Sequence, residues 1–310
     1  MKKHNIIAMA LTSLMALPVI AQDSTPAVGD ILQGINMFTP EEGDPAYKVK
    51  ANEKYGTQWG VDMAYGLWNT EKVSDVKRHN NLALLHAQLN QRLIEDKANG
   101  GTWLRVEFSG SWGLDRESAQ SDTFFTEAYA TASGLHADAM GPHEGIFPEV
   151  ALMQYFAGKR ACLIAGMVNL TNYFDAVSIA NDSFSSFTND GFVNSTILPL
   201  VDSNIGGILQ VELNRNNYMM VAVSRTGCYS GYNPFNSDYC NGYAVVGEYG
   251  HIFADGAATL RINPFYTSTD VDMDDGTGER RRQNAGLVAS IEYTPVSYTH
   301  LRAHETRGNL

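Results

Sequence analysis

Polar and apolar side chains alternate along most of the chain after residue 55. The pattern is clearest in residues 101–112, "GTWLRVEFSGSW". One side of the alternation holds four apolar residues, namely Leu104, Val106, Phe108 and Trp112. Arg105 and Glu107 lie on the other side. Successive side chains of a β-strand point to opposite faces, so this stretch predicts a strand with one apolar and one polar face.

Ten segments share this pattern, and turn-forming residues separate them. The predicted strands are residues 56–69, 82–94, 101–112, 147–156, 159–170, 207–213, 218–224, 243–253, 257–266 and 285–293. Their links are sorted by length, with short ones at 95–101, 157–158, 214–217 and 254–256, and long ones at 113–146, 171–206, 225–242 and 268–284.

This sorting of the links favours one fold over another. Outer-membrane barrels have short periplasmic turns and longer external loops, whereas a soluble sandwich has no reason to separate them. Closure also removes exposed strand edges. The predicted fold is therefore all-β, an antiparallel transmembrane β-barrel, with Val106 toward lipid and Arg105 and Glu107 toward water. A secreted soluble β-sandwich that acts as a binding module remains the alternative.

The amino-terminal residues predict export. Lys2 and Lys3 precede an apolar run, "IIAMALTSLMALPVI", and a small residue, Ala21, ends the stretch. Residues 1–21 therefore have the pattern of a signal peptide. The apolar run is shorter than the ~20 residues of a spanning helix, which disfavours a membrane anchor. We expect a periplasmic amino-terminal segment at 22–55 and the barrel domain at 56–295.

The charge balance bears on partners and ions. Removal of residues 1–21 would take away two of the 22 basic residues and none of the 34 acidic ones, which leaves a formal charge of −14. A chain this acidic is a poor candidate for binding nucleic acid. The acidic run 270–279, "DVDMDDGTGE", departs from an EF-hand because its glycine comes one position late. We expect an external loop there, and neither a metal site nor a cofactor in the chain.

The cysteines and the carboxyl-terminal residues add two further expectations. Cys228 and Cys240 flank a loop-like stretch and are a disulfide candidate in an exported chain, although the spacing leaves the free state open. Cys162 lies in an apolar run and is expected to be buried. From about residue 296 the alternation stops, and "VSYTHLRAHETRGNL" resembles a translated sequencing-adapter tail. We expect 296–310 to be non-native, with a genuine polar tail as the alternative.

Three stretches resemble a known family. They are "NNLALLHAQLNQRLIEDKANGGTWLRVEFSGSWGLD", "PEVALMQYFAGKRACLIAGMVNLTNYFDA" and "GILQVELNRNNYMMVAVS". They are similar to the carbohydrate-selective porins, the OprB-like outer-membrane porins. The resemblance implies a monomeric barrel of sixteen strands whose pore favours sugars. Because this chain supplies about ten strands, we expect it to be truncated at its carboxyl end.

The long link 171–206 carries the chemistry that suits a sugar. It contains no Lys or Arg, and its carboxylates and aromatic rings include Asp175, Asp182, Asp190, Tyr173 and Phe174. Amide and carboxylate groups satisfy sugar hydroxyls, and aromatic rings cover the apolar faces of a sugar. We infer that this loop folds inward and narrows the pore. The alternative is that its rings pack the loop onto the barrel and touch no solute.

Charged residues on the predicted strands complete the candidate pore lining. Arg92, Arg105 and Glu107 would set a transverse field across the pore, with structural ion pairs on the barrel wall as the alternative. Glu212 and Arg261 also fall at predicted inward positions. Short hydrolase, metalloprotease and P-loop motifs do not occur in the sequence.

The predicted function is that of a non-enzymatic porin in the outer membrane of a Gram-negative bacterium. Neutral mono- or oligosaccharides would diffuse through it passively, and outer-membrane lipid would surround it. A barrel hydrolase in the same membrane is the enzymatic alternative, and it would need a Ser–His pair on one rim of the barrel.

Overall fold

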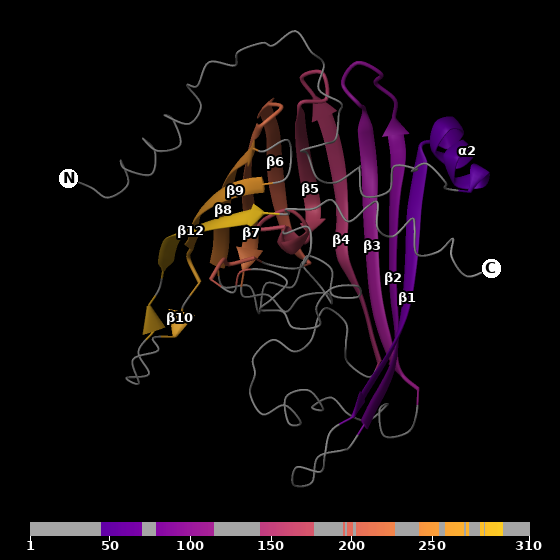
Figure 1. The fold of residues 1–310 in the computed structure, drawn as a ribbon, viewed down its shortest axis with the longest axis horizontal. Coiled ribbons are helices and arrows are strands. Elements are labelled where there is room, and N and C mark those ends of the chain that lie inside the picture. The colour runs from indigo at the N-terminus through magenta and orange to yellow at the C-terminus, as the bar shows by residue number, and fades with distance from the viewer. Residues whose placement is uncertain are drawn as a thin grey trace.

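One antiparallel sheet dominates the protein (Figure 1). The computed structural model describes residues 45–69, 79–114, 143–176, 195, 197–200, 203–226, 242–253, 258–269, 271–272, 280–281 and 283–293. The ten strands of the sheet are β1 (Thr57–Asn69), β2 (His79–Ile94), β3 (Thr102–Gly113), β4 (His143–Phe156), β5 (Ala161–Val168), β6 (Asn204–Asn214), β7 (Asn217–Thr226), β8 (Gly242–Phe253), β9 (Ala258–Thr267) and β12 (Asn284–Tyr293). Each overlaps one predicted segment, so the predicted strand set is confirmed.

Strands that are neighbours in the chain are also neighbours in the sheet. The order is β1-β2-β3-β4-β5-β6-β7-β8-β9-β12. The link from β9 to β12 contains two short strands that the sequence did not predict, β10 (Val271–Asp272) and β11 (Arg280–Arg281). They pair with each other as a separate two-stranded sheet. Because every neighbour is antiparallel, the short links all fall at one end of the sheet and the long links at the other.

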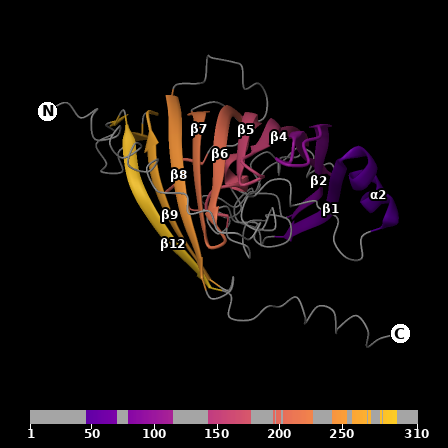
Figure 2. The ribbon, with the colours of Figure 1, turned by 90° about the horizontal axis from the view of Figure 1, so that it is seen from above.

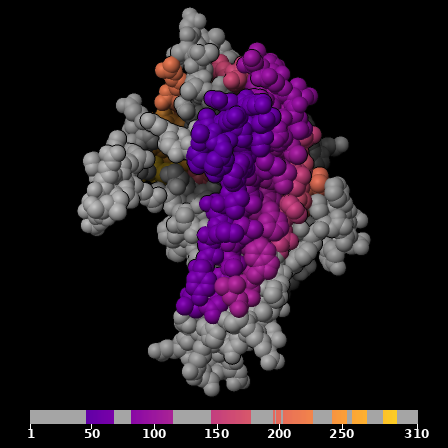
Figure 3. Space-filling model, turned by 90° about the vertical axis from the view of Figure 1, so that its right-hand side faces the viewer, coloured from indigo at the N-terminus to yellow at the C-terminus, as the bar shows by residue number. Residues whose placement is uncertain are grey.

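The helix α2 (Ala46–Tyr55) precedes the sheet and ends at Gly56, whose φ of 64° turns the chain into β1. The ring of Tyr47 stacks on Trp59 with centroids 6.2 Å apart, and Nζ of Lys48 lies 4.9 Å from the same ring. Figure 3 shows the helix against the upper end of β1. No helix among the described residues is both long enough and apolar enough to cross a membrane.

The turn between β2 and β3 shows how local sequence sets a short link. Asp96 accepts hydrogen bonds from the backbone of Ala98 and Asn99 and from the Asn99 side chain. The bonds from Asn99 lower the pKa of Asp96 from its ordinary value. Gly101 has φ of 79°, and a Cβ there would lie 2.1 Å from the carbonyl oxygen of Ile94. Only glycine fits that close approach, which returns the chain into β3.

The two faces of the sheet differ in polarity as the alternation predicts. On β3 the side chains of Arg105 and Glu107 are buried, whereas those of Leu104 and Val106 are partly exposed. Among the described side chains of β1, the exposed ones are large and apolar, up to 81% exposure at Met63, except for Asp62 on the opposite face. The assigned alternation is therefore confirmed, and the exposed face carries the apolar residues.

The buried core lies on the concave side of the sheet. Figure 2 shows that the strands form a curved sheet rather than a flat one. Large apolar side chains gather there from several strands and from the stretch after β5, including Trp103, Met153, Ile164, Leu170, Tyr173, Phe174, Ile208 and Met220. Cys162 joins this cluster as a free, buried thiol, as predicted. The core thus forms between the sheet and a piece of chain that covers its inside.

Candidate functional site

A stretch of eight residues, 169–176, leaves β5 and lies against the concave face of the sheet; we call it the inward segment. It begins with the 3-10 turn η3 (Leu170–Asn172). The side chain of Asn169 accepts hydrogen bonds from the backbone N–H of Thr171 at 3.1 Å and from its hydroxyl at 2.6 Å. This cap satisfies donors that the start of a helical turn leaves open. Leu170 and Phe174 are fully buried, so apolar packing holds the segment in place.

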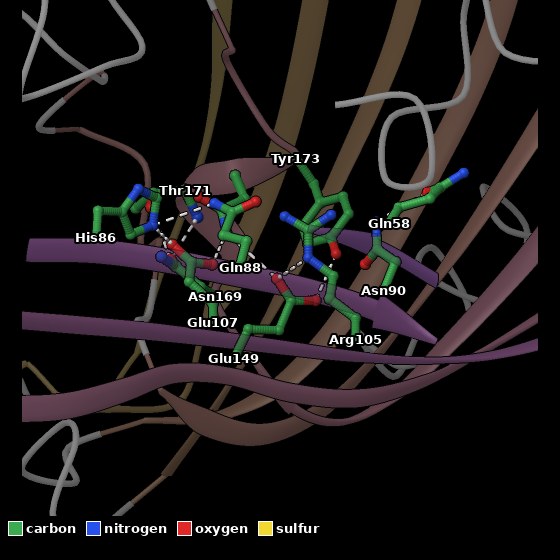
Figure 4. A network of polar contacts seen from close by, with 11 residues as sticks. Gln58, His86, Gln88, Asn90, Arg105, Glu107, Glu149, Asn169, Thr171 and Tyr173 are labelled. Atoms are coloured by element: carbon green, nitrogen blue, oxygen red, sulfur yellow. Dashed lines mark hydrogen bonds and ion pairs between the residues drawn. The ribbon is translucent and has the colours of Figure 1, made fainter. Parts of the chain in front are cut away.

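The first polar attachment of the inward segment is to strands β3 and β4 (Figure 4). The side-chain amide of Asn172 donates to Glu107 at 2.7 Å and to Glu149 at 3.2 Å. The hydroxyl of Tyr173 donates to the other oxygen of Glu149. Glu149 also pairs with Arg105 at 3.1 Å, and both side chains are 0% exposed. The guanidinium of Arg105 in turn lies 5.8 Å from the ring centre of Tyr173.

His86 on β2 adds a third strand to this first attachment. Its Nε2 lies 2.7 Å from Oε1 of Glu107, and its side chain is 21% exposed. The amide nitrogen of Gln88 lies 3.1 Å from the same His86 atom. Each of the two carboxylates, Glu107 and Glu149, therefore has several polar partners, which offsets the free energy lost when a charge leaves water.

The second polar attachment is to strands β8, β9 and β12. Oε2 of Glu248 accepts hydrogen bonds from the backbone N–H of Asp175 at 2.8 Å and from the amide of Asn263 at 2.7 Å. Oε1 of Glu248 accepts from the hydroxyl of Tyr218 at 2.6 Å. Arg261 donates to the carbonyl oxygen of Ala176 at 3.0 Å.

Further contacts secure the same end of the inward segment. One carboxylate oxygen of Asp175 accepts from the backbone N–H of Ser195 at 2.8 Å, and the other accepts from the hydroxyl of Ser290 at 3.3 Å. Arg261 also pairs with Glu292 on β12 at 2.9 Å. The inward segment therefore contacts strands from both halves of the sheet.

Negative charge predominates on the concave face. Among the described residues, the buried carboxylates are Glu107, Glu149, Asp175, Glu212 and Glu248, and the buried guanidinium groups are Arg105 and Arg261. The buried groups described on this face therefore include more carboxylates than guanidinium groups. Fixed negative charge in a confined aqueous space raises the local concentration of cations and lowers that of anions.

The structure separates Arg92 from the other charged residues predicted to line the pore. Its backbone N–H donates to the carbonyl oxygen of Gly56, beside the end of α2. Its side chain pairs with Glu95 at 3.8 Å and lies over the ring of Trp103. Arg92 therefore lies at the end of the sheet with the short links, whereas Arg105 and Glu107 meet the inward segment.

Seven of the predicted pore-lining residues are buried in the structure, namely Arg105, Glu107, Tyr173, Phe174, Asp175, Glu212 and Arg261. Tyr173 and Phe174 are 1% and 0% exposed, so their rings are not free to cover a sugar, and the packing alternative describes their surroundings. Glu212 and Arg261 are buried on the concave face. Arg105 pairs fully buried with Glu149, as in the structural ion-pair alternative. Arg105 and Arg261, which are distant from the inward segment in sequence, contact it in space.

Several predictions fall on residues that the structure does not describe. Asp182, Asp190, Cys228 and Cys240 all lie outside the described residues. So do the predicted signal peptide at 1–21 and the predicted tail at 296–310.

The sequence prediction missed the two carboxylates that hold the inward segment, Glu149 and Glu248. Glu149 lies in a strand whose two faces are both largely apolar, so its facing was ambiguous. Glu248 is the one acidic residue in the otherwise apolar and aromatic strand β8. A lone carboxylate at an inward position of such a strand needs a buried partner, and that signal would have found both residues.

Comparisons with known proteins agree with this fold. No family model matches the chain. An uncharacterized protein of Aquifex aeolicus (strain VF5) is 37% identical over 68 residues, which are 21% of this chain and 22% of that protein. A solved structure of Pseudomonas putida OprB at high pH has a TM-score of 0.54 and 13% identity, over 80% of this chain and 64% of that one.

The likeness to OprB establishes the fold. The chain has an antiparallel, OprB-like porin fold, and it spans less than two thirds of the length of either protein that it matches. At 13% identity the superposition carries no residue roles from one chain to the other.

Proposed function

We propose that this chain is a non-enzymatic channel protein of a Gram-negative outer membrane, through which neutral mono- or oligosaccharides diffuse passively. The observation that carries the proposal is the contrast between the two faces of one curved sheet. The outer face is apolar and exposed, whereas the concave face carries buried polar and charged side chains beside the apolar core and is crossed by the inward segment. A porin needs this contrast because lipid surrounds it and water fills it.

The outer face supports the membrane location. Its exposed side chains include Val61, Met63, Leu67, Leu152, Leu163, Val223, Leu287 and Ile291. An apolar surface gains roughly 25 cal/mol for each Å² removed from water, so such a face is stable when lipid covers it. Most of the strands reach the length of about 9–11 residues that a tilted membrane-spanning strand needs. The signal peptide predicted at 1–21 agrees with export to that membrane.

The concave face supports the choice of a neutral, hydroxyl-rich solute. Amides and carboxylates line it, and sugars carry hydroxyl groups that such side chains hydrogen-bond well. Phosphorylated or other anionic solutes would meet the excess of carboxylates. The sequence resemblance to carbohydrate-selective porins and the structural likeness to OprB both support a carbohydrate. The inward segment would narrow the passage and so limit the size of the solute.

Electrical recording tests the proposal directly. The full chain, reconstituted into a planar lipid bilayer, should produce discrete open channels, and an added neutral oligosaccharide should reduce their current. Liposomes that contain the protein should swell in isotonic glucose faster than protein-free liposomes. Absence of channels and of swelling, with correctly inserted protein, would overturn the proposal.

A further inference from the structure

We propose that Glu248 is a positioning residue that holds the inward segment across the channel interior and thereby sets the size of solute that passes. The proposal rests on the channel function above. It adds a specific residue on β8 that neither the charge pattern nor the strand pattern of the sequence singled out.

The inward segment joins strands that are far apart in the sheet. The hydroxyl of Tyr173 is hydrogen-bonded to Glu149 on β4, and the backbone N–H of Asp175 is hydrogen-bonded to Glu248 on β8. Strands β5, β6 and β7 lie between those two strands. The inward segment is therefore a bridge across the concave side rather than a loop that follows the wall.

The distances explain why the carboxylates matter. Four strand spacings separate β4 from β8 along the sheet, or about 19 Å. The backbone from residue 173 to residue 175 spans at most about 7 Å. Inward-pointing side chains at both ends supply the remaining reach, and curvature of the sheet brings the two strands closer (Figure 2). Loss of the Glu248 side chain removes the acceptor of the Asp175 N–H, and that end of the bridge then keeps only its contacts with Ser195, Ser290 and Arg261.

Glu248 fixes the backbone itself, because the donor is the N–H of Asp175. Asp175 has φ of 52°, in the left-handed region that a non-glycine residue occupies only when its surroundings hold it there. The second oxygen of Glu248 accepts from Tyr218, and Asn263 donates to the first, so Glu248 is itself held in one orientation. With an exposure of 3%, it has no room to reorient toward solvent.

Substitution of Glu248 by Gln tests whether this residue acts through its hydrogen-bond acceptors or through its negative charge. In Glu248→Gln one oxygen can still accept from Asp175 and Asn263, while the new amide can donate to the oxygen of Tyr218. Arg261, which lies 3.9 Å from Glu248, keeps a closer carboxylate partner in Glu292 at 2.9 Å, so loss of the Glu248 charge does not leave this guanidinium unpaired. Glu248→Ala removes every acceptor, and Glu248→Asp withdraws the carboxylate by one methylene.

The experiment compares these three variants with the unmodified full chain in lipid. Single-channel conductance and the largest oligosaccharide that enters liposomes are measured for each, together with amide hydrogen exchange of a peptide that covers residues 170–176. Conductance of one open channel does not depend on how much protein assembles, so a loss of stability alone leaves it unchanged. Gln210→Leu serves as the control, because Gln210 is buried on the same face and its amide donates to the sulfur of Met220.

Glu248→Ala should raise the conductance and admit a larger oligosaccharide, and exchange in the 170–176 peptide should become about tenfold faster or more. Glu248→Asp should shift all three quantities in the same direction, and it covers the case in which the alanine variant fails to assemble. Glu248→Gln and Gln210→Leu should match the unmodified chain. Unchanged conductance and exchange in both the alanine and aspartate variants would overturn the proposal.

The exchange measurement also distinguishes this proposal from the channel function. If the unmodified chain forms no channels, the channel function fails. Faster exchange in Glu248→Ala would then still identify Glu248 as the residue that positions the segment, whereas unchanged exchange would remove that role as well.

Discussion

The hydroxyl of Tyr173 donates its hydrogen bond to Glu149, a residue 24 positions earlier on β4. Both side chains are buried, and the same carboxylate pairs with Arg105. Tyr173, which lies outside the strands, is thus hydrogen-bonded to the carboxylate of an ion pair that joins β3 and β4. This relationship makes the inward segment and the wall of the sheet parts of one buried network.

Tyr173→Phe should reveal the strength of that contact. The substitution removes only the hydroxyl and leaves a buried carboxylate oxygen of Glu149 without its donor, which should lower the free energy of unfolding by about 1–3 kcal/mol. Denaturant unfolding in detergent micelles measures the change. Tyr65→Phe is the control, because its hydroxyl donates to Asn81 from an exposed ring. Equal stability of the two variants would contradict the assigned role of the Tyr173 hydroxyl.

The pair of Arg105 and Glu149 should behave as a buried ion pair. Arg105→Met leaves Glu149 charged and buried, which should cost about 3–5 kcal/mol of stability. The double variant Arg105→Met with Glu149→Met should cost less than the sum of the two single variants, because neither charge is then left alone. A double-mutant cycle by denaturant unfolding measures the coupling.

The control for this cycle is an ion pair at the end of the sheet with the short links. Arg92 and Glu95 lie 3.8 Å apart with Glu95 half exposed, so Glu95→Gln should change stability by no more than about 1 kcal/mol. Strict additivity at Arg105 and Glu149 would argue against a coupled pair.

A charge on the outer face should oppose membrane insertion according to depth. Val106 lies in the middle of β3 on the partly exposed face, and arginine there should cost about 2–4 kcal/mol of insertion free energy. Thr102 lies on the same face at the end of β3, and arginine at this position should cost about 0–1 kcal/mol. Folding yield into lipid vesicles compares Val106→Arg with Thr102→Arg. The assigned lipid face is wrong if both insert equally well.

Two turn glycines should respond differently to alanine. Gly101 and Gly158 both have positive φ, at 79° and 65°. A Cβ at Gly101 would meet the Ile94 carbonyl at 2.1 Å, whereas one at Gly158 would meet no atom within 4 Å. Gly158→Ala should therefore cost only the conformational penalty of about 1–2 kcal/mol, and Gly101→Ala should cost clearly more. Thermal unfolding in detergent ranks the two variants, and the opposite ranking would contradict the turn geometry.

Charge selectivity follows from the acidic interior and the acidic long link. Liposomes should swell faster in glucose than in glucose phosphate, and the difference should shrink in high salt as fixed charges are screened. Replacing Asp182 and Asp190 with Asn should raise entry of glucose phosphate and leave glucose entry nearly unchanged. Glu53→Gln on helix α2 is the control for the loss of an exposed carboxylate outside the sheet. Equal entry of both solutes into liposomes with unmodified protein would show that these charges do not govern passage.

The sequence alone determined the strands and their two faces. Alternation with a period of two follows directly from the geometry of a strand, and the lengths of the links sort the turns to one end. These are local properties, and residues such as Arg105, Glu107 and Val106 lie on the faces that the pattern predicts.

Only the tertiary structure decided what the inward polar residues do. Arg105 on β3 pairs with Glu149 on the adjacent strand β4. Tyr173 and Asp175 form hydrogen bonds with carboxylates that are 24 and 73 positions away in the chain. The alternation states that a carboxylate faces inward but contains no information on which distant donor satisfies it. Sheet curvature and the path of the inward segment bring those groups together, and the cost of burying a charge without a partner then selects the contacts.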